Sequence, residues 1–356
     1  MRRNLVVLSS FLFLATGLHA GDAPVPPELP PLPALRDAKT GPVLAAALDP
    51  YLQGIAAGGT FSGVVLVALE GNLLYTRAFG VANQEKGTAN TPTTRFDIAS
   101  IGKHFTHVAV GQLLAQGKLA LDDTIGKHLP RYPNADAAGK VTIRQLLGHR
   151  GGVVDIFAVA TPAGRAPASN REWFDLVAPR PLEFEPGTEM RYCNGCYVVL
   201  GEIVSALSGM PYERYLAEKV FVPAGMTATA FLDGSAPGAE QAVSYARSAQ
   251  GLRATSIGPG GRGNGAGGVF STAGDLLAYE NALRGYRLLD RERTGWILGG
   301  ETTAARAGGR LGVAGGGEGT NAAFIGDGTW TVIVLTNRDP RTGVDVARAL
   351  AKALGG

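Results

Sequence analysis

Two stretches of apolar residues, one near each end of the chain, predict paired β-strands. The first spans residues 61–82 and is interrupted by the polar turn Glu70-Gly-Asn. The second spans 320–335 and is interrupted by Gly-Asp-Gly at 326–328. Apolar runs of strand length around a short glycine-containing turn are typical of β-hairpins. We therefore predict one antiparallel hairpin near each end of the chain.

The long middle of the chain has a helical pattern instead. Apolar residues recur there every three or four positions, the spacing of one helix face. This pattern predicts helices at 101–116, 143–147, 197–207, 212–219 and 273–283, with a terminal helix at 342–354. Strands from both ends that enclose a helical middle indicate a single sheet. The predicted fold class is α/β (α+β): an antiparallel sheet built from both chain ends, flanked by helices, with a helical subdomain inserted at roughly 100–260.

The first 20 residues have the layout of a signal peptide. Arg2 and Arg3 precede an apolar run at 5–18, and Leu-His-Ala at 18–20 suits cleavage after Ala20. An uncleaved membrane anchor is the alternative, although the run is shorter than the roughly 20 apolar residues that a spanning helix needs. We expect removal of 1–20, no integral membrane span after cleavage, and a periplasmic or secreted protein.

A proline-rich segment, PVPPELPPLP at 24–33, follows the signal peptide. Such a composition favours extended, polyproline-like chain and is typical of linkers. We predict a linker at 21–42 and one globular domain at 43–356.

The composition excludes several classes of protein. With 45% apolar and 18% charged residues among 356, the chain is too apolar to be disordered and too long to be a disulfide-held miniprotein. Its 51 glycines follow no three-residue period, which excludes collagen. The formal charge of +3 is small, so we expect no nucleic-acid partner.

The candidate nucleophile is Ser100, in Ser100-Ile-Gly-Lys103, where a predicted strand gives way to a helix. Residues three apart share a helix face, so Lys103 can reach Ser100. Helix N-terminal N–H groups favour a developing negative charge there. Burial among apolar neighbours would lower the Lys103 pKa and make it a usable base. The simpler alternative is a serine cap followed by a solvated lysine.

A second candidate group is Tyr192-Cys-Asn194, in a loop before the predicted helix 197–207. A phenol near a lysine ammonium ionises more easily, so Tyr192 could shuttle a proton to a leaving group. The Asn194 amide could hold Lys103 and a substrate carbonyl at once. A buried tyrosine and a turn asparagine are the structural alternative.

These motifs occur within a longer series of blocks that resembles the class C β-lactamase and penicillin-binding family. Besides the two motifs, the blocks are LDDTIGKHLP at 121–130, TIRQLLGHRGG at 142–152, PAGMT at 223–227 and GGVFSTAGDL at 267–276. They follow the order of the family over about 45–350. The resemblance implies a serine hydrolase with its site in the cleft between sheet and helices. It also implies that Ser100 is acylated, Lys103 activates it, and Tyr192 relays the proton and later activates water.

The third motif of the family, a Lys or His, then any residue, then Gly, is incomplete in this chain. Alignment of the glycine-rich turn puts Val313-Ala-Gly315 there, so the cation is missing. We expect Gly315 to allow close approach of backbone to an acyl group and the Gly316 N–H to be the second oxyanion donor, beside that of Ser100. Loss of the cation favours neutral esters or amides over β-lactams and D-amino-acid or peptidoglycan-type peptides. Restoration of the charge by a nearby arginine remains an alternative, with Arg306 and Arg310 as candidates.

Two further sets of residues leave alternatives open. Cys193 and Cys196 lie within and just after the tyrosine motif. They are either two free small residues, a local disulfide or, less simply, a redox pair. His104 and His107 lie one helical turn apart but lack an evident third metal ligand. We expect no metal and no cofactor, and a dinucleotide role for the glycines at 263–268 is disfavoured. The alternative to an enzyme is a catalytically impaired binding module of the same fold.

Overall fold

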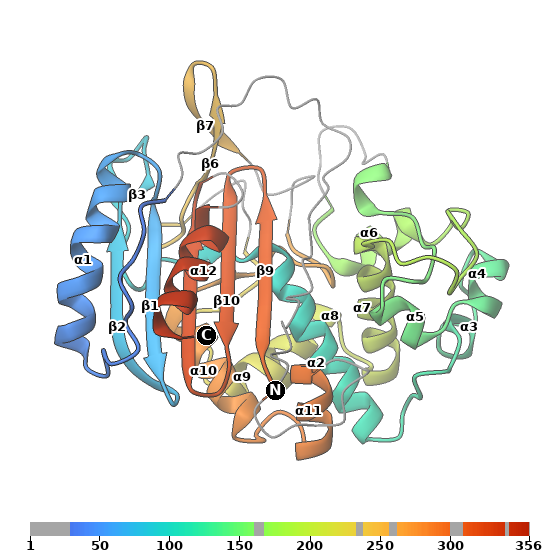
Figure 1. The fold of residues 1–356 in the computed structure, drawn as a ribbon. Helices are drawn as coiled ribbons and strands as arrows, with labels where there is room; N and C mark the ends of the chain where they lie inside the picture. Colours follow the sequence, from blue (N-terminus) through green and yellow to red (C-terminus); the bar gives the residue numbers. More distant parts are fainter. Residues whose placement is uncertain are drawn as a thin grey trace.

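Strands from the two ends of the chain form one five-stranded antiparallel sheet in the computed structural model (Figure 1). The order is β2-β1-β11-β10-β9. The bounds are β1 (Gly63–Leu69), β2 (Asn72–Phe79), β9 (Leu311–Gly317), β10 (Thr320–Gly326) and β11 (Trp330–Thr336). The two predicted hairpins are β1–β2 and β10–β11, and they join where β1 pairs with β11. The predicted fold class is therefore confirmed.

The structure describes residues 29–159, 167–232, 238–255, 262–299, 309–338 and 342–355. The predicted signal peptide and the first part of the predicted linker lie outside these ranges. Within them, no helix combines the length and the apolar character that crossing a membrane requires.

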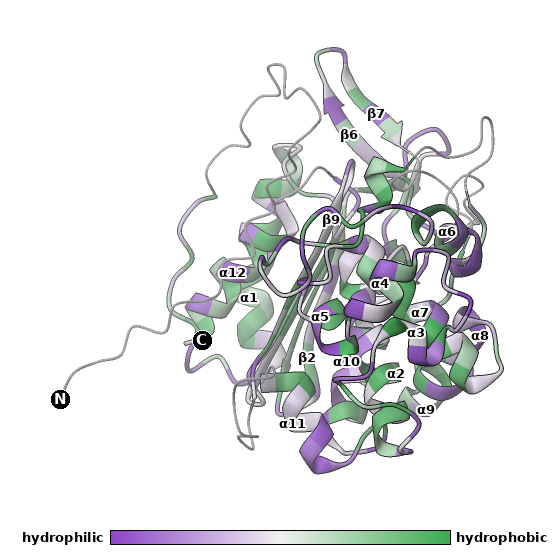
Figure 2. Ribbon diagram, turned by 90° about the vertical axis from the view of Figure 1, so that its right-hand side faces the viewer, coloured by the Kyte–Doolittle hydropathy of each residue, from purple (hydrophilic) through white to green (hydrophobic). Residues whose placement is uncertain are grey.

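Both faces of the sheet are buried, which explains why β1 is apolar throughout rather than alternating. Val65 and Val67 pack against α1 (Gly41–Ala57) and α12 (Thr342–Leu354). Val64 and Leu66 point to the opposite face and join the core formed with the central helices. Figure 2 shows the sheet edge-on between these two layers. Because side chains alternate along a strand, one strand serves two separate cores.

Helix α1 was not predicted, although its apolar residues recur at helical spacing. Leu44, Leu48 and Leu52 are fully buried against the sheet, despite Pro50 within the helix. The segment before α1, which was expected to be linker, also packs on the domain: Leu35 is buried, and its N–H donates to the carbonyl of Ala353 at 2.7 Å. The C-terminal helix therefore helps to hold the chain that leads into the domain.

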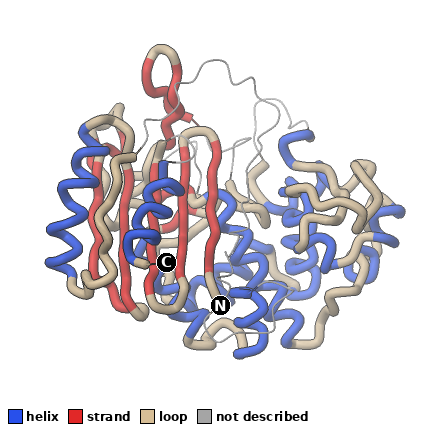
Figure 3. Tube along the Cα trace, in the orientation of Figure 1, coloured by secondary structure: helices blue, strands red, loops and turns tan. Residues whose placement is uncertain are grey.

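The remaining helices lie on the other side of the sheet and beyond the β9 edge (Figure 3). They are α2 (Gly102–Ala115), α3 (Ile125–His128), α4 (Ala135–Lys140), α5 (Ile143–Leu147), α6 (Asn170–Val177), α7 (Asn194–Ser208), α8 (Tyr212–Leu216), α9 (Val222–Ala224), α10 (Ala273–Arg284) and α11 (Arg291–Gly299), with 3-10 turns η1 (Ala99–Ile101) and η2 (Ile156–Ala158) and a π turn η3 (Ala217–Phe221).

Short strands complete the fold: β3 (Val81–Asn83), β4 (Thr88–Ala89), β5 (Phe96–Asp97), β6 (Ser244–Ser248), β7 (Gly251–Thr255) and β8 (Phe270–Ser271). The predicted helices at 101–116, 273–283 and 342–354 correspond to α2, α10 and α12. The predicted helix at 197–207 begins three residues earlier, at Asn194, and the one at 212–219 divides between α8 and η3. Helices α2 and α7 pack side by side, which brings their N-terminal turns together near the β9 edge.

Candidate active site

Ser100 lies in the 3-10 turn η1, directly between β5 and α2. The Asp97 carboxylate accepts a hydrogen bond from the Ala99 N–H at 2.8 Å, which fixes the turn as the chain leaves β5. Ala99 itself has a φ of 44°, an unusual value for a residue with a side chain. Ser100 therefore precedes the α-helix by one tight turn, at the N-terminal end of the helical segment as the sequence predicted.

The Lys103 ammonium is surrounded by oxygen atoms. Nζ lies 3.1 Å from Ser100 Oγ, 2.7 Å from Asn194 Oδ1 and 2.7 Å from the carbonyl oxygen of Ala266. The side chain is buried, and burial lowers the Lys103 pKa to about 7, against an opposing contribution from the negative charge of Asp155. Both expectations for Lys103 are confirmed: it reaches Ser100, and its pKa is lowered.

Tyr192 contacts both Ser100 and Lys103. Its hydroxyl donates to Ser100 Oγ at 2.7 Å, its ring lies 4.7 Å from Lys103 Nζ, and the imidazole of His149 stacks on it with centroids 4.7 Å apart. The expectation of easier ionisation is wrong. Burial raises the Tyr192 pKa, and the nearby Asp155 charge adds to this, so the phenol stays neutral.

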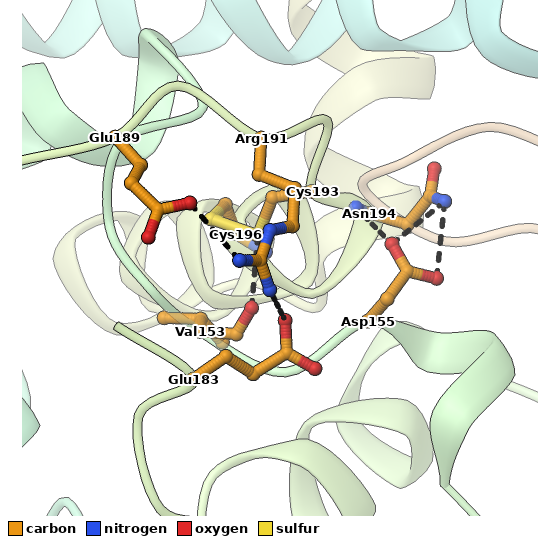
Figure 4. Close-up of polar contacts among 8 residues, drawn as sticks. All are labelled: Val153, Asp155, Glu183, Glu189, Arg191, Cys193, Asn194 and Cys196. Atoms are coloured by element: carbon orange, nitrogen blue, oxygen red, sulfur yellow. Dashed lines mark hydrogen bonds and ion pairs between the residues drawn. A yellow bond between two sulfur atoms is a disulfide. The ribbon is translucent and has the colours of Figure 1, made fainter. Parts of the chain in front are cut away.

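Asn194 is the first residue of α7 and not part of the loop. Its Oδ1 faces Lys103, while its Nδ2 faces the carboxylate of Asp155, with distances of 3.0 and 3.3 Å to the two oxygens (Figure 4). Ser100, Lys103, Tyr192 and Asn194 therefore meet at one point, although they come from two segments of the chain that lie about 90 residues apart.

Cys193 and Cys196 form a disulfide, so they are not the two free small residues that the sequence allowed. The bridge closes the first turn of α7, where the Cys196 N–H also donates to Cys193 Sγ at 2.9 Å. Arg191, the residue before Tyr192, pairs with Glu183 at 3.4 Å and with Glu189 at 3.0 Å (Figure 4). The segment that carries Tyr192 and Asn194 is thus held by a covalent bond and by ion pairs.

The edge strand β9 forms a wall of the site along the turn that carries Ser100. A Cβ atom at Gly315 would lie 2.1 Å from the Ile98 carbonyl oxygen and 2.9 Å from the Ser100 nitrogen. On the other side of the turn, a Cβ atom at Gly267 would lie 2.4 Å from the Ala99 carbonyl oxygen. Glycine at both positions lets backbone approach η1 from two directions. Gly316, the next residue of β9, continues this wall.

The third-motif position holds Val313 in place of a cation, and the Val313 side chain packs partly against the core. Of the two arginines proposed to replace it, Arg310 points to Asp327, with 3.9 Å between the charged groups. Arg306 lies outside the described residues. At the third-motif position, β9 therefore presents main-chain groups and an apolar side chain in place of a positive charge.

Comparison with known proteins gives the family. A family model described as Beta-lactamase matches residues 44–356. The chain belongs to the beta-lactamase family. Because the match spans nearly all of the predicted domain, the resemblance seen in the sequence motifs is confirmed.

Three proteins show what this member of the beta-lactamase family is similar to. Penicillin-binding protein 4* of Bacillus subtilis (strain 168) is 33% identical over 173 residues, which make up 48% of this chain and 38% of that protein. A solved penicillin binding protein from Bacillus halodurans superimposes with a TM-score of 0.73 at 26% identity, covering 85% of this chain and 99% of that one. The D-amino acid amidase of Ochrobactrum anthropi SV3, solved with D-phenylalanine, has a TM-score of 0.67 at 25% identity, covering 86% and 98%.

The sequence matches do not extend over whole relatives. Among the first five curated relatives, the alignments span between 38% and 56% of the relative's own length. The chain thus covers about half of the length of the curated proteins that it matches.

Two groups of this beta-lactamase-family site were missed by sequence reasoning. The Ala266 carbonyl oxygen, a ligand of Lys103, belongs to the glycine block at 263–268, and a main-chain group leaves no residue-type signal. Asp155 lies only three residues beyond the His149-containing block at 142–152, so a search of the chain around that block for carboxylates could have found it.

The histidines have structural partners. His104 Nδ1 lies 2.6 Å from the Tyr279 hydroxyl, and His107 Nε2 lies 3.1 Å from the Tyr197 hydroxyl. His149 Nδ1 accepts the Cys193 N–H at 3.1 Å, so it supports the segment that carries Tyr192. Across the described ranges, no cluster of three or more His, Cys, Asp or Glu side chains is placed to hold a metal ion.

The buried carboxyl of Asp97 makes stability depend on pH. Burial raises its pKa from 3.8 to about 6. Because the folded state holds this proton more tightly than the unfolded state, the protonated carboxyl contributes its full stability below pH 3.8. That contribution is lost as the pH rises through 6. Asp97→Asn keeps an oxygen for the Ala99 N–H but does not ionise. We expect the unfolding free energy of Asp97→Asn minus that of the wild type to increase by roughly 2 kcal/mol between pH 4 and pH 8.

Urea denaturation of both proteins at several pH values across this range measures the difference. Two stability curves that stay parallel from pH 4 to pH 8 would show that Asp97 does not titrate in the folded protein as its burial implies.

Proposed function

We propose that the protein is an exported serine hydrolase that forms an acyl-enzyme at Ser100. The observation that carries this proposal is the position of Ser100 Oγ, 3.1 Å from Lys103 Nζ and 2.7 Å from the Tyr192 hydroxyl. A serine hydroxyl needs an adjacent base to become a nucleophile, and Lys103 supplies one without a histidine. Since the Lys103 pKa is lowered to about 7, a large fraction of this side chain is neutral near neutral pH.

The hydrogen bonds give the proton a defined route. A neutral Lys103 keeps two hydrogens, which suit Asn194 Oδ1 and the Ala266 carbonyl, and its lone pair is then left for the hydroxyl hydrogen of Ser100. As Ser100 Oγ bonds to the substrate carbonyl carbon, its proton moves to Lys103 Nζ. The C–O or C–N bond then breaks, and the leaving group takes this proton from Lys103 through the Tyr192 hydroxyl, so Lys103 is neutral again. Water next attacks the acyl carbon and gives one proton through the Tyr192 hydroxyl to Lys103. The bond from Ser100 Oγ to the acyl carbon breaks, Lys103 returns the proton to Ser100, and the acid is released.

Two main-chain N–H groups are proposed to stabilise the oxyanion, those of Ser100 and Gly316. The two-residue turn at 318–319 makes Gly317 and Thr320 the first pair of the β9–β10 ladder. Hydrogen bonding alternates along an antiparallel ladder, so the N–H of Gly316 turns away from β10, toward the open edge. One such donor contributes about 3–4 kcal/mol to transition-state stabilisation, and it does not depend on the missing cation.

We propose neutral esters and amides as the preferred substrates. Val313 stands where relatives carry a cation, so a substrate carboxylate finds no matching positive charge there. The structural similarity to a D-amino acid amidase and to penicillin binding proteins supports amide, D-amino-acid peptide and β-lactam substrates as further candidates. The signal-like N-terminus supports a periplasmic or secreted location.

A binding module that has lost catalysis is the second candidate, favoured by the same Val313. The experiment that separates the two is intact-mass measurement after incubation with a fluorophosphonate and, separately, with a β-lactam. We expect one fluorophosphonate adduct on the wild type and on Ser248→Ala, a change at a half-buried serine of β6, and none on Ser100→Ala. Equal labelling of wild type and Ser100→Ala, or no labelling and no turnover on an ester and amide panel, would contradict the proposal.

A further inference from the structure

Asp155 bonds Asn194 at three points. It follows the block at 142–152 and comes just before η2, where its Oδ1 accepts the Phe157 N–H at 3.1 Å. Its Oδ2 accepts both the main-chain N–H of Asn194, at 2.8 Å, and the side-chain Nδ2, at 3.0 Å. Oδ1 lies 3.3 Å from the same Nδ2. Asp155 therefore contacts the first residue of α7 through both its main chain and its side-chain amide (Figure 4).

These contacts give the Asn194 amide a direction. An ionised carboxylate only accepts hydrogen bonds, so the donor end of the amide must face Asp155. The acceptor end, Oδ1, is then left for Lys103 Nζ at 2.7 Å. With the amide reversed, an NH₂ group would face the lysine, and Lys103 would lose the acceptor that holds one of its hydrogens away from Ser100.

Asp155 is also the charge that acts on Lys103. The other titratable groups packed around Nζ are Tyr192, Tyr197 and His149, and the Tyr197 ring lies 5.5 Å from Nζ. Burial raises the Tyr192 pKa and lowers the His149 pKa to about 3, so both are neutral near pH 7. The negative charge of Asp155 raises the Lys103 pKa against the larger effect of burial.

We propose that Asp155 is a positioning residue of this site, which fixes the direction of the Asn194 amide and supplies the negative charge behind Lys103. The proposal rests on the proposed function, because it assigns Asp155 a task in preparing Lys103 as the base. Asp155 does not touch Ser100 or a substrate atom. Its effect passes through Asn194 and through the electric field at Lys103.

Two substitutions separate the two tasks. Asp155→Asn removes the charge but keeps one oxygen that can accept from both Asn194 donors. Asp155→Ala removes charge and acceptor together and frees the amide to reverse. Asp175→Asn is the control, since Asp175 is an exposed carboxylate on α6 that pairs with Arg171. The measurement is the pH dependence of kcat and kcat/KM for a chromogenic ester, with thermal melting of each variant to confirm folding.

We expect the acid limb of kcat/KM for Asp155→Asn to move to lower pH, because Lys103 loses a charge that stabilises its protonated form. Its rate on the plateau falls less than tenfold. For Asp155→Ala, we expect kcat to fall about 100-fold, through the lost orientation of Asn194 and Lys103, with a smaller change in KM. Asp175→Asn should match the wild type in both respects.

An unchanged acid limb in folded Asp155→Asn, or a kcat for Asp155→Ala within twofold of wild type, would overturn the proposal. These outcomes differ from failure of the proposed function, which shows as a wild type that neither turns over ester nor labels at Ser100. A merely structural role predicts lower melting temperatures and lower rates at every pH without movement of the limb.

Discussion

We expect Lys103→Ala to lower kcat/KM about 10³-fold, within the range that one positioned general base contributes. The reason is the proton route: among the described residues, the hydrogen-bond partners found for Ser100 Oγ are Lys103 Nζ and the Tyr192 hydroxyl, neither of them a histidine. Lys103→Arg is the informative companion. Arginine keeps a cation in the same place but does not deprotonate in a protein, so it cannot serve as the base. We expect it to be as impaired as the alanine variant.

The wild-type pH profile checks the same assignment. Burial lowers the Lys103 pKa to about 7, and the lysine is active only when neutral. The rate should therefore rise with pH through about 7 and level off above it. Retention of more than a tenth of wild-type kcat/KM by Lys103→Arg would contradict the role of Lys103 as base, and so would a rate that does not change between pH 6 and pH 8.

The second large effect is expected at Gly315. A methyl group there would lie 2.1 Å from the Ile98 carbonyl oxygen and 2.9 Å from the Ser100 nitrogen. Both are backbone atoms, so no side-chain rotation can relieve the overlap. Gly315→Ala must therefore displace either β9 or the turn that presents Ser100. We expect a loss of about 1–3 kcal/mol in unfolding free energy. Because Ser100 and the N–H of Gly316 no longer align, kcat/KM should fall about 100-fold.

Gly312→Ala is the matched control on the same strand. No atom lies within 4 Å of a Cβ built at Gly312, so the methyl group meets open space. We expect its stability to stay within about 0.5 kcal/mol of wild type and its activity to be unchanged. Urea denaturation and ester hydrolysis of both variants measure the contrast. Equal behaviour of the two alanine variants would show that close approach at Gly315 does not hold the Ser100 turn.

Features encoded by neighbours in sequence were predictable. The hairpins at 61–82 and 320–335 follow from apolar runs and turn residues, and they became β1–β2 and β10–β11. The approach of Lys103 to Ser100 follows from a spacing of three residues on one helical segment. Helix α1 shows a limit of the same reasoning, because Pro50 in its middle interrupts a pattern that tertiary packing of Leu44, Leu48 and Leu52 nevertheless supports.

Features that depend on distant segments were not predictable. Asp155 reaches Asn194 across 39 positions, and Lys103 reaches the Ala266 carbonyl across 163. The tyrosine pKa was expected to fall, because the sequence shows a cation nearby but not how deeply the ring is buried. The pairing of Cys193 with Cys196 is local by contrast, but it depends on the conformation of the turn that opens α7, which residue types alone leave undecided.

The sequence by itself determined the fold class, the family and the identity of Ser100, Lys103, Tyr192 and Asn194 as candidate residues, since these rest on local patterns and ordered motifs. Only the tertiary structure decided which groups surround Lys103, that Tyr192 stays neutral, and that glycine at position 315 lets backbone meet backbone. The physical reason is that burial, electric field and close approach are properties of the space around an atom. That space is filled by residues far away along the chain.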